Sequence, residues 1–255
     1  KIRMKGFCKD DSLKLKEGPC EYYYRSGKLF ARRYFINGKQ HGLDKSWYES
    51  GQLQDSAMYI NGVAIGTEKG WHEDGSLRFI TTNDTLGNGN GSSENYYANG
   101  VLRSKGDLKK QKRDGVWFFY REDKSPASEV TFEKDSVLAY KAFDEKGNLL
   151  SKIKDFEREA NFKGGENAWN KYMSTRLSAI YQMSEPWSYS GSCTVQFIID
   201  KTGNVTNVEA IESTNENLSK LAITCILQSK KWTPAIQYNL PVKAWRRQKF
   251  TFRYQ

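Results

Sequence analysis

A glycine that recurs at a nearly fixed interval is the feature that most limits how this chain can fold. Spacings of 24, 24, 25 and 24 residues separate five such glycines: Gly18, Gly42, Gly66, Gly91 and Gly115. Self-similarity at a period of this length is typical of repeat proteins, in which each structural unit stacks on the next. We therefore expect the first part of the chain to be an array of similar units.

Two further features recur in these units. Paired rings follow four of the glycines by five and six residues: Tyr23–Tyr24, Trp47–Tyr48, Trp71–His72 and Tyr96–Tyr97. In the fifth unit the pair comes one residue earlier, at Phe119–Tyr120. A second glycine follows nine residues after each of the first four, and a leucine lies two residues beyond it. A degenerate sixth copy spans residues 143–149.

The composition of each unit indicates a β-hairpin. The second glycines lie in dipeptides such as Asp74-Gly75 and Asn99-Gly100, which supply the positive φ that tight hairpin turns need. One hairpin cannot bury its rings alone, but stacked hairpins can. We therefore predict that residues 1–150 form an all-β meander of stacked antiparallel hairpins, with the aromatic pairs packed as its spine.

The combined pattern, Y-x-x-G-x-L followed by x-Y-x-N-G-x-x-x-G, resembles MORN-type repeats in their bacterial variant. The resemblance covers more than half of the chain. The pattern is interrupted at residues 81–87 in the third unit and at residues 122–124 in the fifth. The resemblance implies an interaction scaffold or a binding surface, without naming one ligand.

The character of the sequence changes after Leu150, where the period disappears. Residues 151–162 are charged and helix-prone, and we interpret them as a linker. In residues 163–255 the pattern predicts helices over 169–180 and 217–229, a hairpin over 192–211 and a last strand over 245–254. The order helix, strand, strand, helix, strand predicts an α+β domain, with two helices on a three-stranded antiparallel sheet.

This second part resembles the C-terminal domain of TonB-type energy transducers. The resemblance rests on short motifs in a fixed order: Phe162-x-Gly164-Gly165, Val195-x-Phe197-x-Ile199-Asp200, Leu218-x-x-Leu221-Ala222, Lys231-Trp232-x-Pro234-Ala235, Pro241-Val242 and Phe250-x-Phe252. It implies a periplasmic domain that binds a short extended peptide of an outer-membrane transporter by strand addition at a sheet edge.

We expect the final strand to be the acceptor of such a peptide. Its expected binding residues are Lys249, Phe250, Thr251, Phe252, Arg253 and Tyr254. The same strand can instead pair internally, or pair with a second copy to give a homodimer. Force transmission is not indicated, because the sequence shows neither an inner-membrane anchor nor a long spacer.

The chain has four cysteines, two near each end. No C-x-x-C and no Cys/His cluster with zinc spacing occurs, so we expect no structural metal site. Cys193 and Cys225 lie on a predicted strand and a predicted helix that point into one core, where they could be two free thiols or one disulfide. We expect the disulfides Cys8–Cys20 and Cys193–Cys225, and with them an oxidising compartment such as the periplasm or cell envelope.

The first residues and the hydropathy pattern bear on location. No run of 18 apolar residues occurs, so we predict no membrane-spanning helix. The chain begins KIRMKGFCKDD, without the apolar stretch of a signal peptide. We therefore expect either a cytosolic protein or, as the cysteines favour, an envelope protein whose signal peptide or anchor is absent from this chain.

We find no catalytic motif. The two histidines, His41 and His72, fall in the repeat register, and no nucleophile elbow, H-E-x-x-H or Walker A sequence occurs. We expect a non-enzymatic binding protein without a cofactor and without a nucleic-acid partner. The net charge of +10 and the basic runs at 109–113 and 246–249 leave one alternative. In it, the repeats bind a protein, a lipid head group or an acidic polymer, and the second domain serves for dimerisation.

Overall fold

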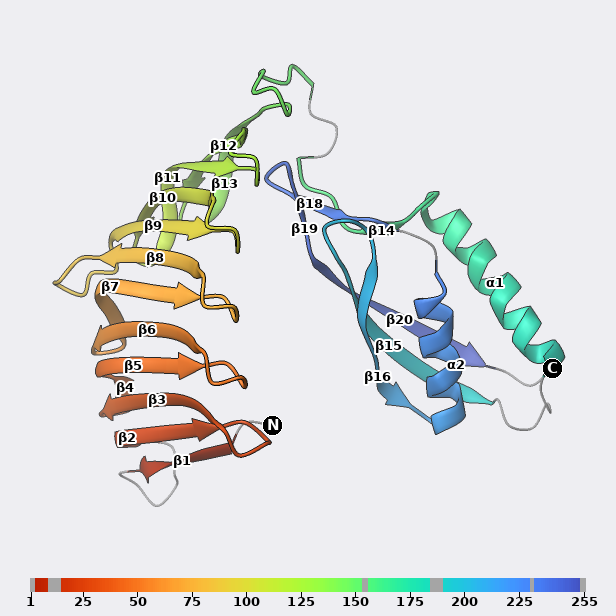
Figure 1. Ribbon diagram of the computed structural model, residues 1–255, viewed down its shortest axis with the longest axis horizontal. Helices are drawn as coiled ribbons and strands as arrows, with labels where there is room; N and C mark the ends of the chain where they lie inside the picture. Colours follow the sequence, from red (N-terminus) through yellow and green to blue (C-terminus); the bar gives the residue numbers. More distant parts are fainter. Residues whose placement is uncertain (1–2, 9–14, 153–155, 184–189, 230–231, 253–255) are drawn as a thin grey trace. The chain divides into compact units, whose positions relative to one another are not determined.

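The computed structural model describes residues 3–8, 15–152, 156–183, 190–229 and 232–252. The chain divides into two compact units, Lys1–Ser151 and Lys152–Gln255 (Figure 1). Each unit has its own fold.

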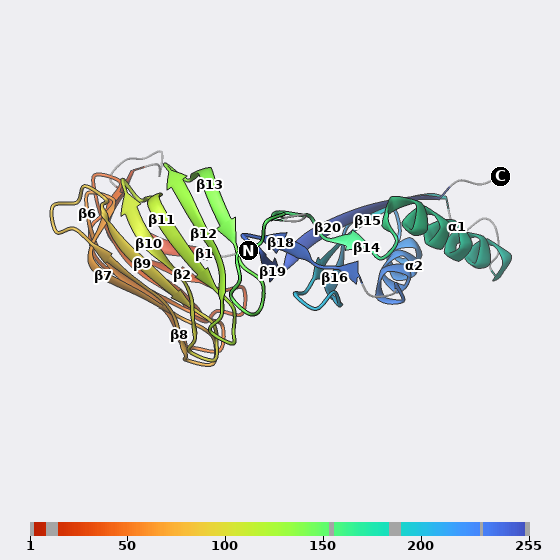
Figure 2. The same ribbon diagram turned by 90° about the horizontal axis from the view of Figure 1, so that it is seen from above.

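The first unit is one antiparallel sheet in which strands that follow one another in sequence also lie side by side (Figures 1 and 2). Its order is β1-β2-β3-β5-β6-β7-β8-β9-β10-β11-β12-β13, and the short β4 pairs with β3. The strands are β1 (Arg3–Cys8), β2 (Lys16–Tyr23), β3 (Leu29–Ile36), β4 (Lys39–Gln40), β5 (Gly42–Trp47), β6 (Leu53–Ile60), β7 (Val63–Trp71), β8 (Leu77–Asn83), β9 (Gly91–Tyr96), β10 (Leu102–Lys109), β11 (Lys112–Tyr120), β12 (Pro126–Glu133) and β13 (Ser136–Ala142). The predicted hairpin meander is confirmed.

The repeated glycine is required for two different backbone reasons. Gly42 has φ +76°, a conformation that L side chains rarely adopt. Gly91 has no such φ, but a Cβ atom there would lie 2.0 Å from the carbonyl oxygen of Thr82 on the neighbouring strand. The repeated glycine therefore permits a left-handed backbone conformation in one unit and a close approach of two strands in another.

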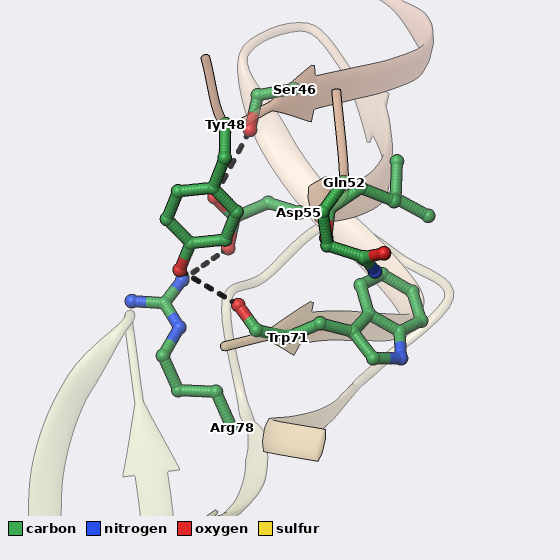
Figure 3. A network of polar contacts seen from close by, with 7 residues as sticks. Ser46, Tyr48, Gln52, Asp55, Trp71 and Arg78 are labelled. Atoms are coloured by element: carbon green, nitrogen blue, oxygen red, sulfur yellow. Dashed lines mark hydrogen bonds and ion pairs between the residues drawn. The ribbon is translucent and has the colours of Figure 1, made fainter. Parts of the chain in front are cut away.

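The paired rings do not pack as the predicted spine; most are only half-buried. Instead, the side chain of the second residue of each pair forms a hydrogen bond with a backbone carbonyl in the next unit. That carbonyl belongs to the first residue of the next unit's pair. Tyr24, Tyr48 and Tyr97 donate their hydroxyls to the carbonyls of Trp47, Trp71 and Tyr120 at 2.8, 2.9 and 2.8 Å. We call this series the hydroxyl ladder, and Figure 3 shows its Tyr48 rung.

Two members of the ladder are not tyrosines. A ring nitrogen of His72 lies 3.3 Å from the carbonyl oxygen of Tyr96. In the fifth unit Arg121 takes the same place and donates to the carbonyl of Phe143 at 2.6 Å. The pair in that unit is therefore Tyr120–Arg121, in phase with the others, and not Phe119–Tyr120. Phe119 is instead a core residue that is 7 % exposed.

The sixth copy is incomplete in the structure. Its turn forms, since the Asp144 side chain accepts the backbone N–H groups of Lys146 and Asn148 at 2.9 and 2.8 Å. Among the residues described there, one bridge follows, Phe143 with Leu149. The array therefore stops part of the way through a repeat, and β13 is the last strand of its sheet.

The second unit has the predicted α+β order. Its elements are β14 (Asn161–Phe162), α1 (Gly165–Met183), β15 (Gly191–Ile199), β16 (Val205–Ser213), α2 (Glu216–Leu227), β17 (Trp232–Thr233), β18 (Ala235–Gln237), β19 (Leu240–Val242) and β20 (Ala244–Phe252). The main sheet has the order β16-β15-β20, and α2 lies on it.

Asn215 caps α2 by accepting the Leu218 N–H at 2.9 Å, as expected for this residue type at a helix start. Sequence patterns missed the two small sheets β14-β17 and β18-β19, because their strands have only two or three residues.

The end of the predicted linker is part of the second unit. Phe156, Ala160 and Phe162 are buried, β14 pairs with β17, and Arg158 forms a backbone bridge with Ile236. Charged residues lie between these apolar ones, and they gave the segment the composition of a linker. Its apolar side chains are nevertheless buried in the second unit.

The expected disulfides do not form among the cysteines whose side chains are described. Cys20, Cys193 and Cys225 are free, buried thiols. Cys20 lies opposite Gly6 in the β1–β2 register and Cys8 lies opposite Lys16, so the two cysteines are not direct cross-strand partners. Cys193 and Cys225 do share one core, as predicted, but a disulfide also requires Cα atoms within about 4.4–6.8 Å and aligned Cβ atoms.

Candidate functional site

Strand β20 forms one edge of the main sheet of the second unit, with β15 on its inner side. The direction of its backbone groups follows from the neighbouring pair of strands. The carbonyl of Ser192, opposite Thr251, accepts the Thr214 N–H from the β16 side at 3.0 Å. Because antiparallel pairs alternate between hydrogen-bonded and non-bonded positions, Thr251 directs its N–H and C=O away from β15. The same holds for Trp245, Arg247 and Lys249, so within the described part of the chain β20 offers a row of open backbone groups.

The expected binding residues fall into three groups. Lys249 and Thr251 are exposed. Phe250 is only 2 % exposed and its side chain belongs to the core. Phe252 pairs with Gly191 through its backbone, while Arg253 and Tyr254 lie outside the described residues.

A groove follows the first half of β20. Two adjoining cavities, of about 630 and 470 Å³, share the lining residues Arg158, Glu159, Ala160 and Arg246. The groove thus runs between β20 and the segment that leads into β14. Its position differs from the sequence prediction, which placed the binding residues from Lys249 onwards.

One wall of the groove is aromatic. The ring of Trp169 on α1 lies 5.1 Å from that of Phe162 and 5.0 Å from that of Trp232. The Trp169 Nε1–H donates to Gln248 Oε1 at 3.0 Å and so ties α1 to β20. This bond between an indole and an amide holds one side of the groove in place.

The other wall is charged. Arg246 on β20 forms an ion pair of 2.7 Å with Glu159. Arg247, on the opposite face of β20, bonds through its Nε to Gln196 Oε1 at 2.8 Å. The basic run 246–249 is thus divided between the two faces of an edge strand. The sequence signalled this run, but not its neighbours Glu159 and Trp169, which come from distant segments.

The first unit carries a polar cluster on the face of its sheet that also carries Ala31 and Ala57. Asp55 contacts both Ser46 and Arg78, as Figure 3 shows. Arg33 pairs with Asp44 at 3.1 Å. Burial raises the pKa of Asp44 against the opposing effect of Arg33.

Two further members of this cluster are Glu68 and Tyr59. Burial is the main cause of a raised pKa for Glu68, and the nearby carboxylates of Asp55 and Asp44 add to it while Arg78 opposes it. Burial also raises the pKa of the Tyr59 hydroxyl to about 12. The face is polar, but its charges are largely matched within the sheet.

The described residues contain no group of three or more His, Cys, Asp or Glu side chains arranged to hold a metal ion. Within the same part of the chain, no helix is long and apolar enough to cross a membrane.

Comparison with known families agrees with this geometry. The family described as "Gram-negative bacterial TonB protein C-terminal" matches residues 187–254, a stretch that includes β15, β16, α2 and all strands up to β20. The MORN repeat variant matches residues 16–37, 40–61 and 90–110. The gap between the second and third matches includes residues 81–87, where the repeat pattern is interrupted. Among curated proteins, none matches the chain. Both families are non-catalytic. The chain therefore carries MORN-variant repeats followed by a TonB-type C-terminal domain.

Proposed function

We propose that this chain is a non-enzymatic protein of the Gram-negative cell envelope whose second unit binds an extended peptide. The peptide adds as a strand to the free edge of β20, and its side chains enter the groove beside Arg246 and Trp169. The repeats act as an interaction scaffold. The observation that carries the proposal is the open row of backbone groups on β20 with a groove along it.

The chemistry of the groove is consistent with this mode of binding. In strand addition, main-chain hydrogen bonds supply affinity and pockets for alternate side chains supply specificity. Every second residue of a peptide on β20 faces the Trp169 wall, and the others face Arg247 and Lys249. The Arg246–Glu159 pair lies within reach of a polar peptide side chain.

The test uses the full chain and synthetic peptides copied from the N-termini of outer-membrane transporters. Amide chemical shifts should change for Trp245, Arg247, Lys249 and Thr251, whose N–H groups face the free edge. Thr251→Pro removes one of those donors without removing a bond to β15, because proline is tolerated where an edge N–H faces solvent. We expect it to weaken binding about tenfold, the equivalent of one or two hydrogen bonds.

Thr251→Val is the matched control, because it keeps the N–H group and the β-branched shape. Binding should survive in this variant and should change little with added salt, since backbone hydrogen bonds are not screened like exposed charges. If Thr251→Pro binds as well as the unaltered chain, or if the shifts map to the first unit, peptide addition at β20 is wrong. Binding that is lost at high salt favours the alternative, a charge-driven partner of the repeats.

A further inference from the structure

Two adjoining cavities lie beside the polar cluster of the first unit. Their volumes are about 210 and 420 Å³, and both are lined by Gln40, Tyr59 and Glu68. These residues come from three different strands, β4, β6 and β7. The cavities belong to the first unit, so peptide binding at β20 does not account for them.

The cavities lie where the repeat departs from its own pattern. The residues two positions after the repeated glycines are, in order, Cys20, Asp44, Glu68, Ser93 and Trp117. Those at the two ends of this series are apolar and buried, at 1 % and 4 % exposed, whereas Glu68 in the middle is a carboxylate that is only half-buried.

A second repeat position shows the same change. The residues 17 positions after the same glycines are Phe35, Tyr59, Asn83, Leu108 and Phe132. The phenylalanines at the two ends are buried. Between them, Tyr59, Asn83 and Leu108 line open space. The cavities therefore follow from substitutions in the middle units, at positions where the end units carry apolar residues.

Glu68 leaves one negative charge unmatched at this place. Of the three carboxylates that line the smaller cavity, Asp44 pairs with Arg33 and Asp55 with Arg78, the second pair being drawn in Figure 3. Among the described residues, the Glu68 carboxylate has neither an ion pair nor a hydrogen bond. Burial raises its pKa, and the charges of Asp55 and Asp44 raise it further. A cation bound beside Glu68 would offset both effects.

The neighbours of this carboxylate can accept further hydrogen bonds. The amide of Gln40 donates to Asp44 and that of Asn83 donates to the Gly66 carbonyl, so both amide oxygens remain as acceptors among the described residues. Burial raises the pKa of Tyr59 to about 12, which keeps its hydroxyl neutral. An ammonium group has three donors and no acceptor, and such a set of oxygens suits it. Because the oxygens come from separate strands, they suit a compact ammonium better than a planar guanidinium.

We propose that these two cavities bind the side chain of a lysine presented by a partner protein. The ammonium group lies against Glu68, and the aliphatic stem lies along Ala64 and Leu108, which line the larger cavity. One unmatched carboxylate fits one ammonium group, whereas a free polyamine would leave its other charges without a partner. The contact gives the proposed scaffold a specific ligand chemistry and does not depend on the β20 site.

The probe is lysine blocked at both ends, Nα-acetyl-lysine methylamide, added to the full chain and followed by amide chemical shifts. A ligand of this size should bind with a dissociation constant of about 1 mM. The shifts should change for Gln40, Tyr59 and Glu68. The same compound made with norleucine has the aliphatic stem without the ammonium group, and it should not bind measurably.

Two variants test the lining residues. Glu68→Gln keeps the shape of the side chain and removes its charge, and it should weaken binding of the probe about tenfold, as for a hydrogen bond to a charged group. Tyr59→Phe supplies the residue that the end units carry at this position and should weaken binding about threefold. Glu145→Gln, at an exposed turn, is the control and should bind like the unaltered chain. Circular dichroism establishes that each variant is folded.

Several results would overturn the proposal. Binding of the lysine probe that Glu68→Gln leaves unchanged does so, and so does equal binding of the norleucine compound. If spermidine shifts the same amides while blocked lysine does not, the cavities take a free amine and the lysine contact is wrong. The β20 site is read separately, from shifts in the second unit. A chain that binds a peptide at β20 but no lysine here contradicts this proposal alone.

Discussion

At the scale of residues, the hydroxyl ladder explains why a tyrosine follows a large ring in most repeats. Backbone groups within a strand are satisfied by the neighbouring strand. A carbonyl at the end of a strand, next to a hairpin turn, needs another donor. The Tyr48 hydroxyl accordingly donates to the Trp71 carbonyl of the next unit. Arg121 does the same for Phe143 where the repeat departs from its pattern. This position therefore needs a side chain that is long enough to donate a hydrogen bond to that carbonyl, and residues other than tyrosine can fill it.

Removing one rung should weaken the first unit. Tyr48→Phe deletes the donor and keeps the ring, so we expect a loss of about 1 kcal/mol in the free energy of unfolding. Chemical denaturation followed by circular dichroism measures the loss. Tyr34→Phe is the control, because Tyr34 is 44 % exposed and is not a member of the ladder. Equal effects of the two substitutions contradict a role for the ladder.

At the scale of elements, the polar face of β5, β6 and β7 shows that a repeat sheet need not have an apolar interior. Ser46 is 6 % exposed and bonds to Asp55 at 3.1 Å. Toward the ends of the array, Phe35 and Phe132 occupy buried positions instead. The middle of the sheet is therefore held by backbone pairing and polar contacts, and its ends by apolar packing.

Glu68 on β7 should make this face sensitive to pH. Because its pKa is raised in the folded state, ionisation opposes folding, and stability is lost as the pH rises from the unfolded pKa of about 4.3 through the folded pKa. Glu68→Gln should therefore unfold at a higher urea concentration than the unaltered chain at pH 7. The difference should disappear at and below about pH 4, where the unaltered side chain is neutral. Glu145→Gln, at an exposed turn, should show no such gain at pH 7.

At the scale of the whole molecule, the chain joins a sheet built from local contacts to a domain built from distant ones. Neighbouring strands of the first unit follow one another in sequence, whereas β15 pairs with β20 some fifty residues later. Phe156 is the first buried residue in the described part of the second unit, and its ring lies 6.0 Å from that of Tyr238. The boundary between the two folds therefore falls before residue 156.

This boundary can be tested by destabilising each unit separately. Phe156→Ala should destabilise the second unit by about 3 kcal/mol, through lost burial and the cavity left behind. Phe132→Ala, at a position 2 % exposed, should have a similar effect on the first unit. Hydrogen exchange resolved along the chain measures both. If Phe156→Ala increases exchange throughout β2–β12, residue 156 does not belong to the second unit alone.

The sequence by itself determined the features that repeat or that occur in order along the chain. The period of 24 residues, the hairpin turns and the order of helices and strands in the second part are local signals, since backbone conformation and side-chain alternation act over a few residues. They were sufficient for both folds and for both family resemblances. The final strand was also predicted from its alternating aromatic residues, although these place Phe250 in the core and leave Lys249 and Thr251 outside.

Only the tertiary structure decided which segments meet. Trp169, Glu159 and Arg246 come together in the groove from three separate segments, and no spacing in the sequence encodes that meeting. The free thiols of Cys193 and Cys225 show the same limit, because pointing into one core does not fix the distance between two sulfur atoms. Both outcomes depend on contacts between residues that are far apart in the sequence. Such contacts produce no periodic pattern from which they could be predicted.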